Sequence, residues 1–253
     1  MDKWFDGDVA LVTGGSSGIG RATALAFSML GAKVLIASRR SEEAAETVKL
    51  IEAAGGSATF VKTDVSKAAE VEEMVNEAVK QFGSLTYAFN NAGIEGDAFV
   101  PTAEYSESVW DDVIDINLKG VFLCMKYEIP YILKAKGAIV NMASVAGLCG
   151  GRVGAAYYAS KHGVVGLTKA AALEYAGNGI RINAVAPAII KTPMAERAFF
   201  HDEELTTRVT KMHPIGRVGS PEEVASAVTW LCSKGASFIT GHTLPVDGGF
   251  LIP

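Results

Sequence analysis

Cysteine, histidine and long apolar runs are all scarce in this sequence of 253 residues. Its cysteines, Cys124, Cys149 and Cys232, are odd in number and widely spaced, which argues against a disulfide framework and favours a reducing compartment. The histidines form no metal-binding spacing, so we expect no metal site. No apolar run approaches the roughly 20 residues of a membrane helix, and residues 1–7 are too polar for a signal peptide. We therefore expect a cytoplasmic protein with no membrane partner.

An excess of basic residues is also missing. The chain has 23 Lys and Arg against 28 Asp and Glu, for a net charge of −5, so we expect no nucleic-acid partner. Apolar residues, by contrast, make up 49% of the chain, and the mean hydropathy of +0.24 is slightly high for a soluble monomer. The excess must be buried, either in a sheet covered on both faces or between subunits.

Short β-rich runs alternate with longer segments of helical periodicity. We expect strands at about 9–12, 33–37, 58–61, 85–89, 138–142, 180–185 and 238–246. We expect helices at about 19–30, 41–51, 66–82, 107–134, 155–176 and 220–232. This order predicts an α/β fold of the Rossmann type: a doubly wound parallel sheet of about seven strands, with helices on both faces. One domain covers residues 1–253, and residues 193–219 form an excursion outside the sheet that we expect to bind substrate.

A glycine-rich turn, Thr13 to Gly20, lies between the first strand and the first helix. Glycine lets the backbone approach a pyrophosphate closely, and the free N–H groups at a helix start attract the anion. An ordinary tight turn is the alternative, but a position between a strand and an amphipathic helix favours dinucleotide binding. The residues expected to hold the phosphates are Gly14, Ser16, Ser17, Gly18, Ile19 and Gly20.

The second strand ends in Ser38, Arg39 and Arg40 rather than in an acidic residue. In dinucleotide folds a carboxylate at this place binds the ribose 2′-hydroxyl of NAD, whereas arginine accommodates the 2′-phosphate of NADP. A hydroxyl and two guanidinium groups are complementary to phosphate. The alternative is a solvated basic turn. We predict that NADP(H) is the preferred cofactor.

Tyr157 and Lys161 are four residues apart in a helical segment, so they share one face. An ammonium near a phenol favours phenolate, and we expect it to lower the Tyr157 pKa so that this residue can exchange a proton with substrate. Tyr158 points about 100° away and would pack or line the pocket. Ser144 follows the expected strand 138–142, where a hydroxyl can reach a substrate oxygen. The alternative for Tyr157 and Lys161 is a pair of exposed side chains on a helix. The alternative for Ser144 is an ordinary turn residue.

Asn117 is a polar amide within the apolar helical stretch 107–134. A buried amide needs hydrogen-bond partners. It is either a satisfied core residue or part of a relay that holds water near Lys161.

Taken together, these residues resemble the short-chain dehydrogenase/reductase family, in its shorter single-domain branch. The resemblance covers nearly the whole chain, and it depends on the joint order and spacing of several motifs. The motifs are Thr13-Gly14 with Gly18-Ile19-Gly20, Asp64-Val65, Asn90-Asn91-Ala92-Gly93, Asn117, Ser144, Tyr157 with Lys161, and Pro187 to Thr192.

The resemblance implies a set of roles. Tyr157 is the general acid/base, Lys161 lowers its pKa and binds the nicotinamide ribose, Ser144 orients the carbonyl, and Asn117 sustains the proton relay. Further cofactor contacts are implied for Asp64, Val65, Asn91, Ala92, Gly93, Pro187, Ile190 and Thr192. The family is commonly tetrameric, which implies a homotetramer.

Two positions depart from the family pattern. Ala188 follows Pro187, where the family often has glycine, and we expect a slightly stiffer loop with activity retained. NADP(H)-preferring members often carry a basic residue in the glycine turn, where this chain has Ser16 and Ser17. Arg39 is then expected to do most of the discrimination, and some use of NAD(H) stays open.

We therefore predict an oxidoreductase that transfers a hydride between NADP(H) and a ketone or secondary alcohol. The candidate pocket is mainly apolar, except for Glu95, which could meet a hydroxyl or an amine. A carrier-bound substrate is less favoured, because the expected docking surface offers mainly Lys134 and Lys136. The alternatives are an isomerase, epimerase or dehydratase with a retained NAD(P), and a nucleotide-sensing protein without activity.

Overall fold

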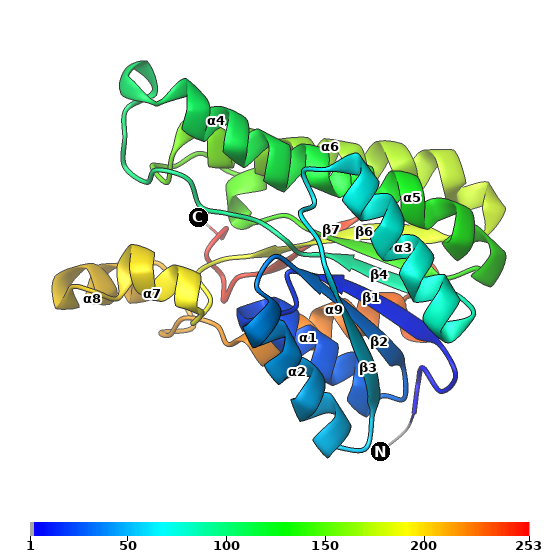
Figure 1. Cartoon of the computed structure of the whole chain (residues 1–253). Coiled ribbons are helices and arrows are strands. Elements are labelled where there is room, and N and C mark those ends of the chain that lie inside the picture. The colour runs from blue at the N-terminus through cyan, green and yellow to red at the C-terminus, as the bar shows by residue number, and fades with distance from the viewer. Residues whose placement is uncertain (1–2, 253) are drawn as a thin grey trace.

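Seven parallel strands form one twisted sheet in the computed structural model, which describes residues 3–252 (Figure 1). In sheet order the strands are β3 (Ser57–Lys62), β2 (Lys33–Ser38), β1 (Val9–Thr13), β4 (Tyr87–Asn90), β5 (Ala138–Met142), β6 (Arg181–Pro187) and β7 (Thr243–Val246). Every pairing between neighbours is parallel. The chain runs outward from β1 to β3 and then crosses back to β4, so the winding direction reverses between β1 and β4.

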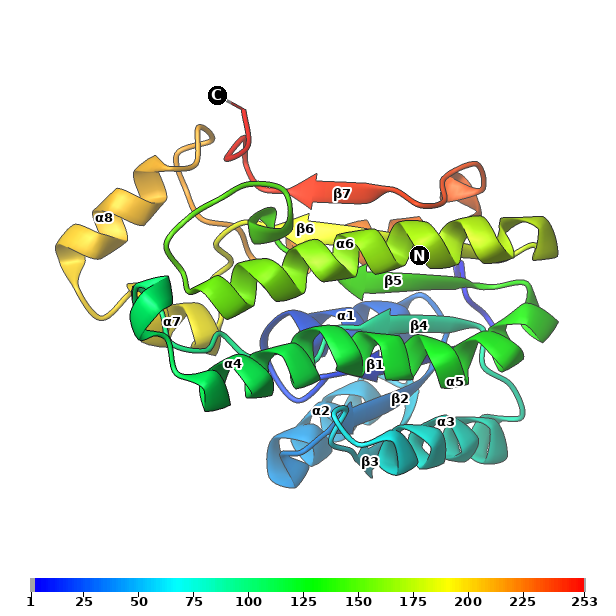
Figure 2. The ribbon, with the colours of Figure 1, turned by 90° about the horizontal axis from the view of Figure 1, so that it is seen from above.

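Helices cover both faces of this sheet (Figures 1 and 2). On one face lie α1 (Gly18–Met29), α2 (Ser41–Ala53) and α9 (Pro221–Cys232). On the other lie α3 (Ala68–Phe82), α4 (Glu107–Ile114), α5 (Gly120–Ala135) and α6 (Ala155–Tyr175). The predicted doubly wound parallel sheet is confirmed. None of the helices within residues 3–252 has both the length and the apolar character needed to cross a membrane.

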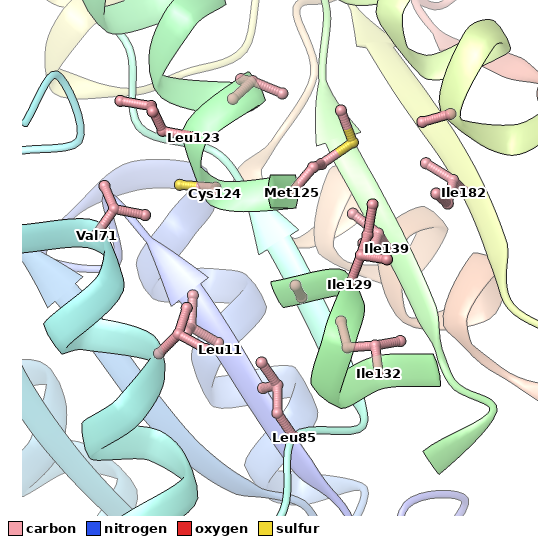
Figure 3. Close-up of a cluster of buried hydrophobic side chains, with 14 of the residues drawn as sticks. Leu11, Val71, Leu85, Leu123, Cys124, Met125, Ile129, Ile132, Ile139 and Ile182 are labelled. Carbon is pink, nitrogen blue, oxygen red and sulfur yellow. The ribbon is translucent and has the colours of Figure 1, made fainter. Parts of the chain in front are cut away.

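Two apolar cores lie on either side of the sheet, because alternate residues of a strand face opposite ways. Leu11 faces α3 and α5, where it joins a cluster with Val71 and Ile132 (Figure 3). Val12 faces α1 and packs in the second cluster with Phe27. All residues of β1 are buried. A strand buried on both faces is held in one register, so the residues that follow it are held in fixed positions.

The helical stretch expected at 107–134 contains a feature that the sequence does not reveal. Between α4 and α5 the structure has a π-helical turn, Asp115–Lys119, which includes Asn117. Pro130 lies within α5, which continues to Ala135. A π-turn inserts one residue into the helix, and such turns are frequent at functional sites.

Residues 193–219 follow β6 and lie outside its strand. They form two short helices, α7 (Pro193–Phe199) and α8 (Glu203–Lys211). Both project beyond the end of the sheet to which the strands point (Figures 1 and 2). The buried ring of His213 receives a hydrogen bond from the backbone N–H of Ile189 at 3.3 Å, which ties the base of this segment to the end of β6.

Candidate active site

The site lies at the carboxyl edge of the sheet, because parallel strands all end there. Most of the residues expected to bind cofactor follow a strand end. They are Gly14, Ser16 and Ser17 after β1; Ser38, Arg39 and Arg40 at the end of β2; Asp64 and Val65 after β3; Asn91, Ala92 and Gly93 after β4; and Pro187, Ile190 and Thr192 at and after β6. The structure brings these segments to one edge, on both sides of the reversal between β1 and β4. Open α/β sheets place their ligands in the crevice at such a reversal.

The glycine turn is held by the segment after β4. The Thr13 hydroxyl accepts hydrogen bonds from the backbone N–H groups of Asn91 and Ala92, at 2.9 and 3.0 Å. The Asn91 amide in turn donates to the Thr13 carbonyl at 2.9 Å. A Cβ on Gly20 would lie 2.3 Å from the carbonyl oxygen of Gly14, so no side chain fits there. The turn is therefore pre-formed, and it depends on glycine for its close backbone approach.

The start of α1 has the features of an anion site. Ser17 stands at the N-cap position, yet its side chain makes no capping bond, so the first N–H groups of the helix stay available. Gly18 has a φ of 51°, and a Cβ there would lie 3.2 Å from the Thr192 methyl group. The segment after β6 thus comes directly beside the helix start. A pyrophosphate fits this arrangement of free donors and missing side chains.

The two arginines at the end of β2 point to different places. The Arg40 guanidinium donates to the hydroxyls of Ser16, at 2.9 Å, and Ser17. Ser38 also donates to Ser16, at 2.9 Å. Arg39 is exposed, and its positive charge lowers the pKa of Asp64. Arg40 therefore supplies the positive charge within the glycine turn that the sequence of the turn itself lacks.

Asp64 and Val65 close the far end of this edge. Burial alone would raise the pKa of Asp64. Hydrogen bonds from Ser66 and the charges of Arg39 and Lys67 together lower it by more, so the pKa lies below its usual value. Its carboxylate accepts from the Ser66 backbone and hydroxyl, at 3.1 and 2.7 Å. Val65 is buried against Gly120, the first residue of α5. Asp64 is therefore an ionised carboxylate fixed at the strand end.

Ser144, Tyr157 and Lys161 converge where β5 meets α6. Ser144 follows β5 and is buried, and its hydroxyl donates to the Pro187 carbonyl at 3.4 Å. The same hydroxyl lies close enough to the Tyr157 phenol to lower its pKa. The Lys161 ammonium donates to the Met142 carbonyl at 2.8 Å and lies 5.6 Å from the centre of the Tyr157 ring. The structure thus brings together three residues that the sequence separates by up to 17 positions.

The expected lowering of the Tyr157 pKa does not appear in the structure. Burial raises the pKa of this phenol, and the hydrogen bond from Ser144 opposes that rise only in part. Burial also lowers the pKa of Lys161 to about 8. The ammonium donates to a backbone carbonyl and lies beside the ring, and burial is the largest influence on the Tyr157 pKa.

Asn117 clamps the segment after β4 onto α6. Its amide accepts from the Ile94 N–H at 2.8 Å, and donates to the Ile94 carbonyl at 2.9 Å and to the Ser160 hydroxyl at 3.4 Å. These contacts satisfy a fully buried amide, as the simpler of the two interpretations expects. The relay toward Lys161 stays a prediction.

A buried polar network beside the site was missed in the sequence. The fully buried Glu128 carboxylate accepts from the Asn90 amide at 3.0 Å, and that amide also donates to Asn141 at 3.1 Å. Asn141 donates to Thr168 at 3.0 Å. Burial raises the pKa of Glu128 to about 8. The signal was an acidic residue one position before Ile129, on the apolar side of a helix.

Glu128 predicts a pH dependence of stability. Its pKa is about 8 in the folded protein against 4.5 for an exposed carboxyl, so between these values only the unfolded chain has released the proton. The contribution of Glu128 to the free energy of unfolding is complete below pH 4.5. It is lost as the pH rises toward 8, by at most about 1.4 kcal/mol per pH unit. Urea unfolding at several pH values should show that the free energy of unfolding falls less steeply with pH in Glu128→Gln than in wild type. Parallel losses would contradict the assignment.

Comparison with known proteins agrees with this geometry. Residues 14–251 match the family model described as enoyl-(acyl carrier protein) reductase. A cyclohexanol dehydrogenase of Acinetobacter sp. is 49% identical over 99% of this chain and 97% of its own length. A 2,5-dichloro-2,5-cyclohexadiene-1,4-diol dehydrogenase of Sphingobium indicum is 44% identical over 96% of this chain and 97% of its own.

A solved structure of levodione reductase superimposes with a TM-score of 0.92 and 38% identity, covering 97% of this chain and 98% of its own. The chain therefore belongs to the short-chain dehydrogenase/reductase family, and these relatives are named as dehydrogenases and reductases.

Proposed function

We propose that this protein is an NADP(H)-dependent oxidoreductase that interconverts a secondary alcohol and a ketone, with Tyr157 as the proton-transfer residue. The observation that carries the proposal is the convergence of Ser144, Tyr157 and Lys161 at the sheet edge that holds the glycine turn. A nucleotide-sensing protein would need the turn but not the phenol–hydroxyl–ammonium group. An isomerase or dehydratase would need both, and the assay below separates it.

The cofactor would lie along the carboxyl edge, with its pyrophosphate at the start of α1. The residues that would hold it include Gly14, Gly18 and Asn91 near the phosphates and ribose, Asp64 and Val65 at the adenine, and Ile190 and Thr192 at the carboxamide. When bound, the nicotinamide supplies the hydride acceptor or donor. Pro187 accepts the Ser144 hydrogen bond through its carbonyl, which fixes the hydroxyl beside this end of the crevice.

The protein's own residues handle the proton. In the reducing direction Tyr157 gives its phenolic proton to the oxygen of the former carbonyl, while the Ser144 hydroxyl turns from the Pro187 carbonyl and donates its hydrogen bond to the same oxygen. In the oxidising direction the phenolate removes the proton of the alcohol. Lys161 stabilises the phenolate through its positive charge. These donors act on charge that develops during the reaction, so they raise its rate rather than only the affinity.

Arg39 and Arg40 support the choice of NADP(H) over NAD(H). Removing one charge-assisted hydrogen bond to a phosphate costs about 1.5–3 kcal/mol, which is roughly 10–100-fold in affinity. Fluorescence titration should therefore show Arg39→Ala and Arg40→Ala weakening NADPH by about that factor, and NADH far less. Lys49→Ala, an exposed cation on α2, is the matched control. Equal losses for the two cofactors would refute the phosphate assignment.

The substrate proposed is a secondary alcohol or ketone with an apolar body. Buried Val145 and Ala146 follow Ser144, so the wall beside the reactive oxygen is apolar. The similarity to the cyclohexanol and cyclohexadiene-diol dehydrogenases supports a cyclic substrate. Cyclohexanol with NADP⁺ should give one reduced nicotinamide per cyclohexanone formed. Product without net nicotinamide reduction would favour an isomerase or dehydratase, and cofactor binding without turnover on a panel of alcohols and ketones would favour a sensor.

We also propose a cytoplasmic homotetramer. The scarcity of cysteine supports the compartment. Exposed apolar side chains on the helices of one face support the assembly: Trp110 on α4, Phe122 on α5 and Leu173 on α6, the last of them 84% exposed. Light scattering of the purified protein gives the mass directly.

A further inference from the structure

One ion pair joins the two sides of the site. Glu95 follows β4, Arg197 lies on α7, and their side chains meet at 3.0 Å although 102 residues separate them. Among residues 3–252, this is the one side-chain hydrogen bond or ion pair that links α7 and α8 to residues outside 192–213. Glu95 is therefore fixed between the catalytic region and the projecting segment.

The backbone around Glu95 is held on both sides. Asn117 binds the N–H and the carbonyl of Ile94, and the same amide contacts Ser160, the neighbour of Lys161. Gly96 has a φ of 67°, and a Cβ there would lie 2.6 Å from the Tyr105 hydroxyl. Asn117 therefore anchors the segment before Glu95 to the turn of α6 that carries Tyr157 and Lys161. This anchor and the close packing at Gly96 restrict the Glu95 backbone.

The Glu95 carboxylate lies close enough to the Tyr157 phenol for its negative charge to act there. After burial and the opposing effect of Ser144, this charge is the next influence on the Tyr157 pKa, which it raises. Val145 and Ala146, which follow Ser144, are buried and apolar.

One oxygen of this carboxylate is free to bind a ligand. Arg197 engages Oε1, while Oε2 makes no hydrogen bond among the described residues, and the side chain is 28% exposed. Because Arg197 already offsets the negative charge, a second cation gains less here than a neutral O–H donor. Hydrogen bonds to an ionised carboxylate are about twice as strong as those between neutral groups.

Building on the function proposed above, we propose that Glu95 is a specificity-determining residue whose free carboxylate oxygen accepts a hydrogen bond from a second hydroxyl of the substrate. The preferred substrates would then be cyclic diols and the corresponding hydroxyketones rather than simple cyclic alcohols. A site with a polar group aimed at a substrate hydroxyl discriminates against the analogue that lacks it, because the polar group is then left unpaired.

The test compares kcat/KM for cyclohexanol with that for cyclohexane-1,2-, 1,3- and 1,4-diol, in wild type and in Glu95→Ala. In wild type at least one diol should exceed cyclohexanol by about 10-fold or more. Glu95→Ala should lower kcat/KM for that diol about 10–100-fold more than for cyclohexanol, the factor expected for a hydrogen bond to a charged group. The loss should appear mainly in KM if the contact forms on binding.

Two further variants separate recognition from a structural latch. Arg197→Met removes the ion pair but keeps the carboxylate, so the diol preference should survive. Glu104→Ala removes an exposed acid from the same loop and should not change the preference. A wild type with no diol preference, or an equal loss for both substrates in Glu95→Ala, would overturn the inference. Inactivity of wild type on all four compounds would instead count against the proposed function.

Discussion

Replacing Tyr157 by phenylalanine is expected to lower kcat about 10²–10⁴-fold, the usual contribution of a positioned general acid or base. The change removes the hydroxyl that exchanges the proton and leaves the ring that packs in α6. NADPH affinity should stay within a few-fold, because the glycine turn and both arginines are untouched. Steady-state rates followed at the nicotinamide absorbance, together with an NADPH titration, measure both effects.

Tyr158→Phe is the matched control for this experiment. Tyr158 is the next residue of α6, and it lines a hollow together with Phe99 and Gly151. The same chemical change there should alter kcat only slightly. Comparable losses in the two variants would show that the phenol at 157 has no special role, and would leave the site without its proton-transfer group.

Lys161→Met is expected to produce the second largest loss, about 10²-fold or more in kcat. Methionine keeps an unbranched apolar stem but removes the ammonium, which donates to the Met142 carbonyl at 2.8 Å and favours the Tyr157 phenolate. Without that charge the phenol ionises less readily, so the rate of alcohol oxidation should rise with pH only at higher pH than in wild type. A pH series of kcat measures this shift.

The pH range of the Lys161 effect follows from its own ionisation. Burial lowers the pKa of Lys161 to about 8 while Tyr157 is neutral. Ionisation of Tyr157 holds the proton on Lys161 to higher pH, because the phenolate and the ammonium stabilise each other. Lys161→Arg, which stays charged, should retain more activity than Lys161→Met. Lys169→Met, on an exposed position of the same helix, is the control. An unchanged pH profile in Lys161→Met would contradict the role of the ammonium.

The fold was predictable from the sequence because its signals are local. Short apolar runs such as 9–12 and 138–142 are separated by amphipathic helices, and that alternation leads to a parallel sheet. The site residues near strand ends were predictable for the same reason. Once the strands are parallel, Gly14, Ser38 and Ser144 have to share one edge. The pairing of Tyr157 with Lys161 needs only helical spacing.

Features that depend on side-chain direction were not predictable. The sequence assigned most of the cofactor discrimination to Arg39, whereas in the structure Arg40 is the one bonded to the serines of the glycine turn. Adjacent residues point in different directions, and only the fold shows which direction meets Ser16. The titrations of the two single variants measure how much each arginine contributes to the preference for NADPH.

Burial was the other quantity that the sequence could not supply. The Tyr157 pKa is raised rather than lowered, because the loss of solvent outweighs the opposing effect of Ser144. Glu128 looked like an ordinary helix residue, yet it is fully buried beside Asn90 and Asn141. The π-turn at Asn117 shifts the helix by one residue, and hydrophobic periodicity does not register such a shift within a continuous helix.

The most direct test of the account is the pH dependence of a single turnover of cyclohexanol oxidation, followed by nicotinamide absorbance, in wild type and in Tyr157→Phe. If the Tyr157 phenolate removes the alcohol proton, the wild-type rate constant rises with pH as the phenol ionises, while the variant is slow and loses that rise. The same rising profile in both proteins, at similar rates, would show that another group moves the proton.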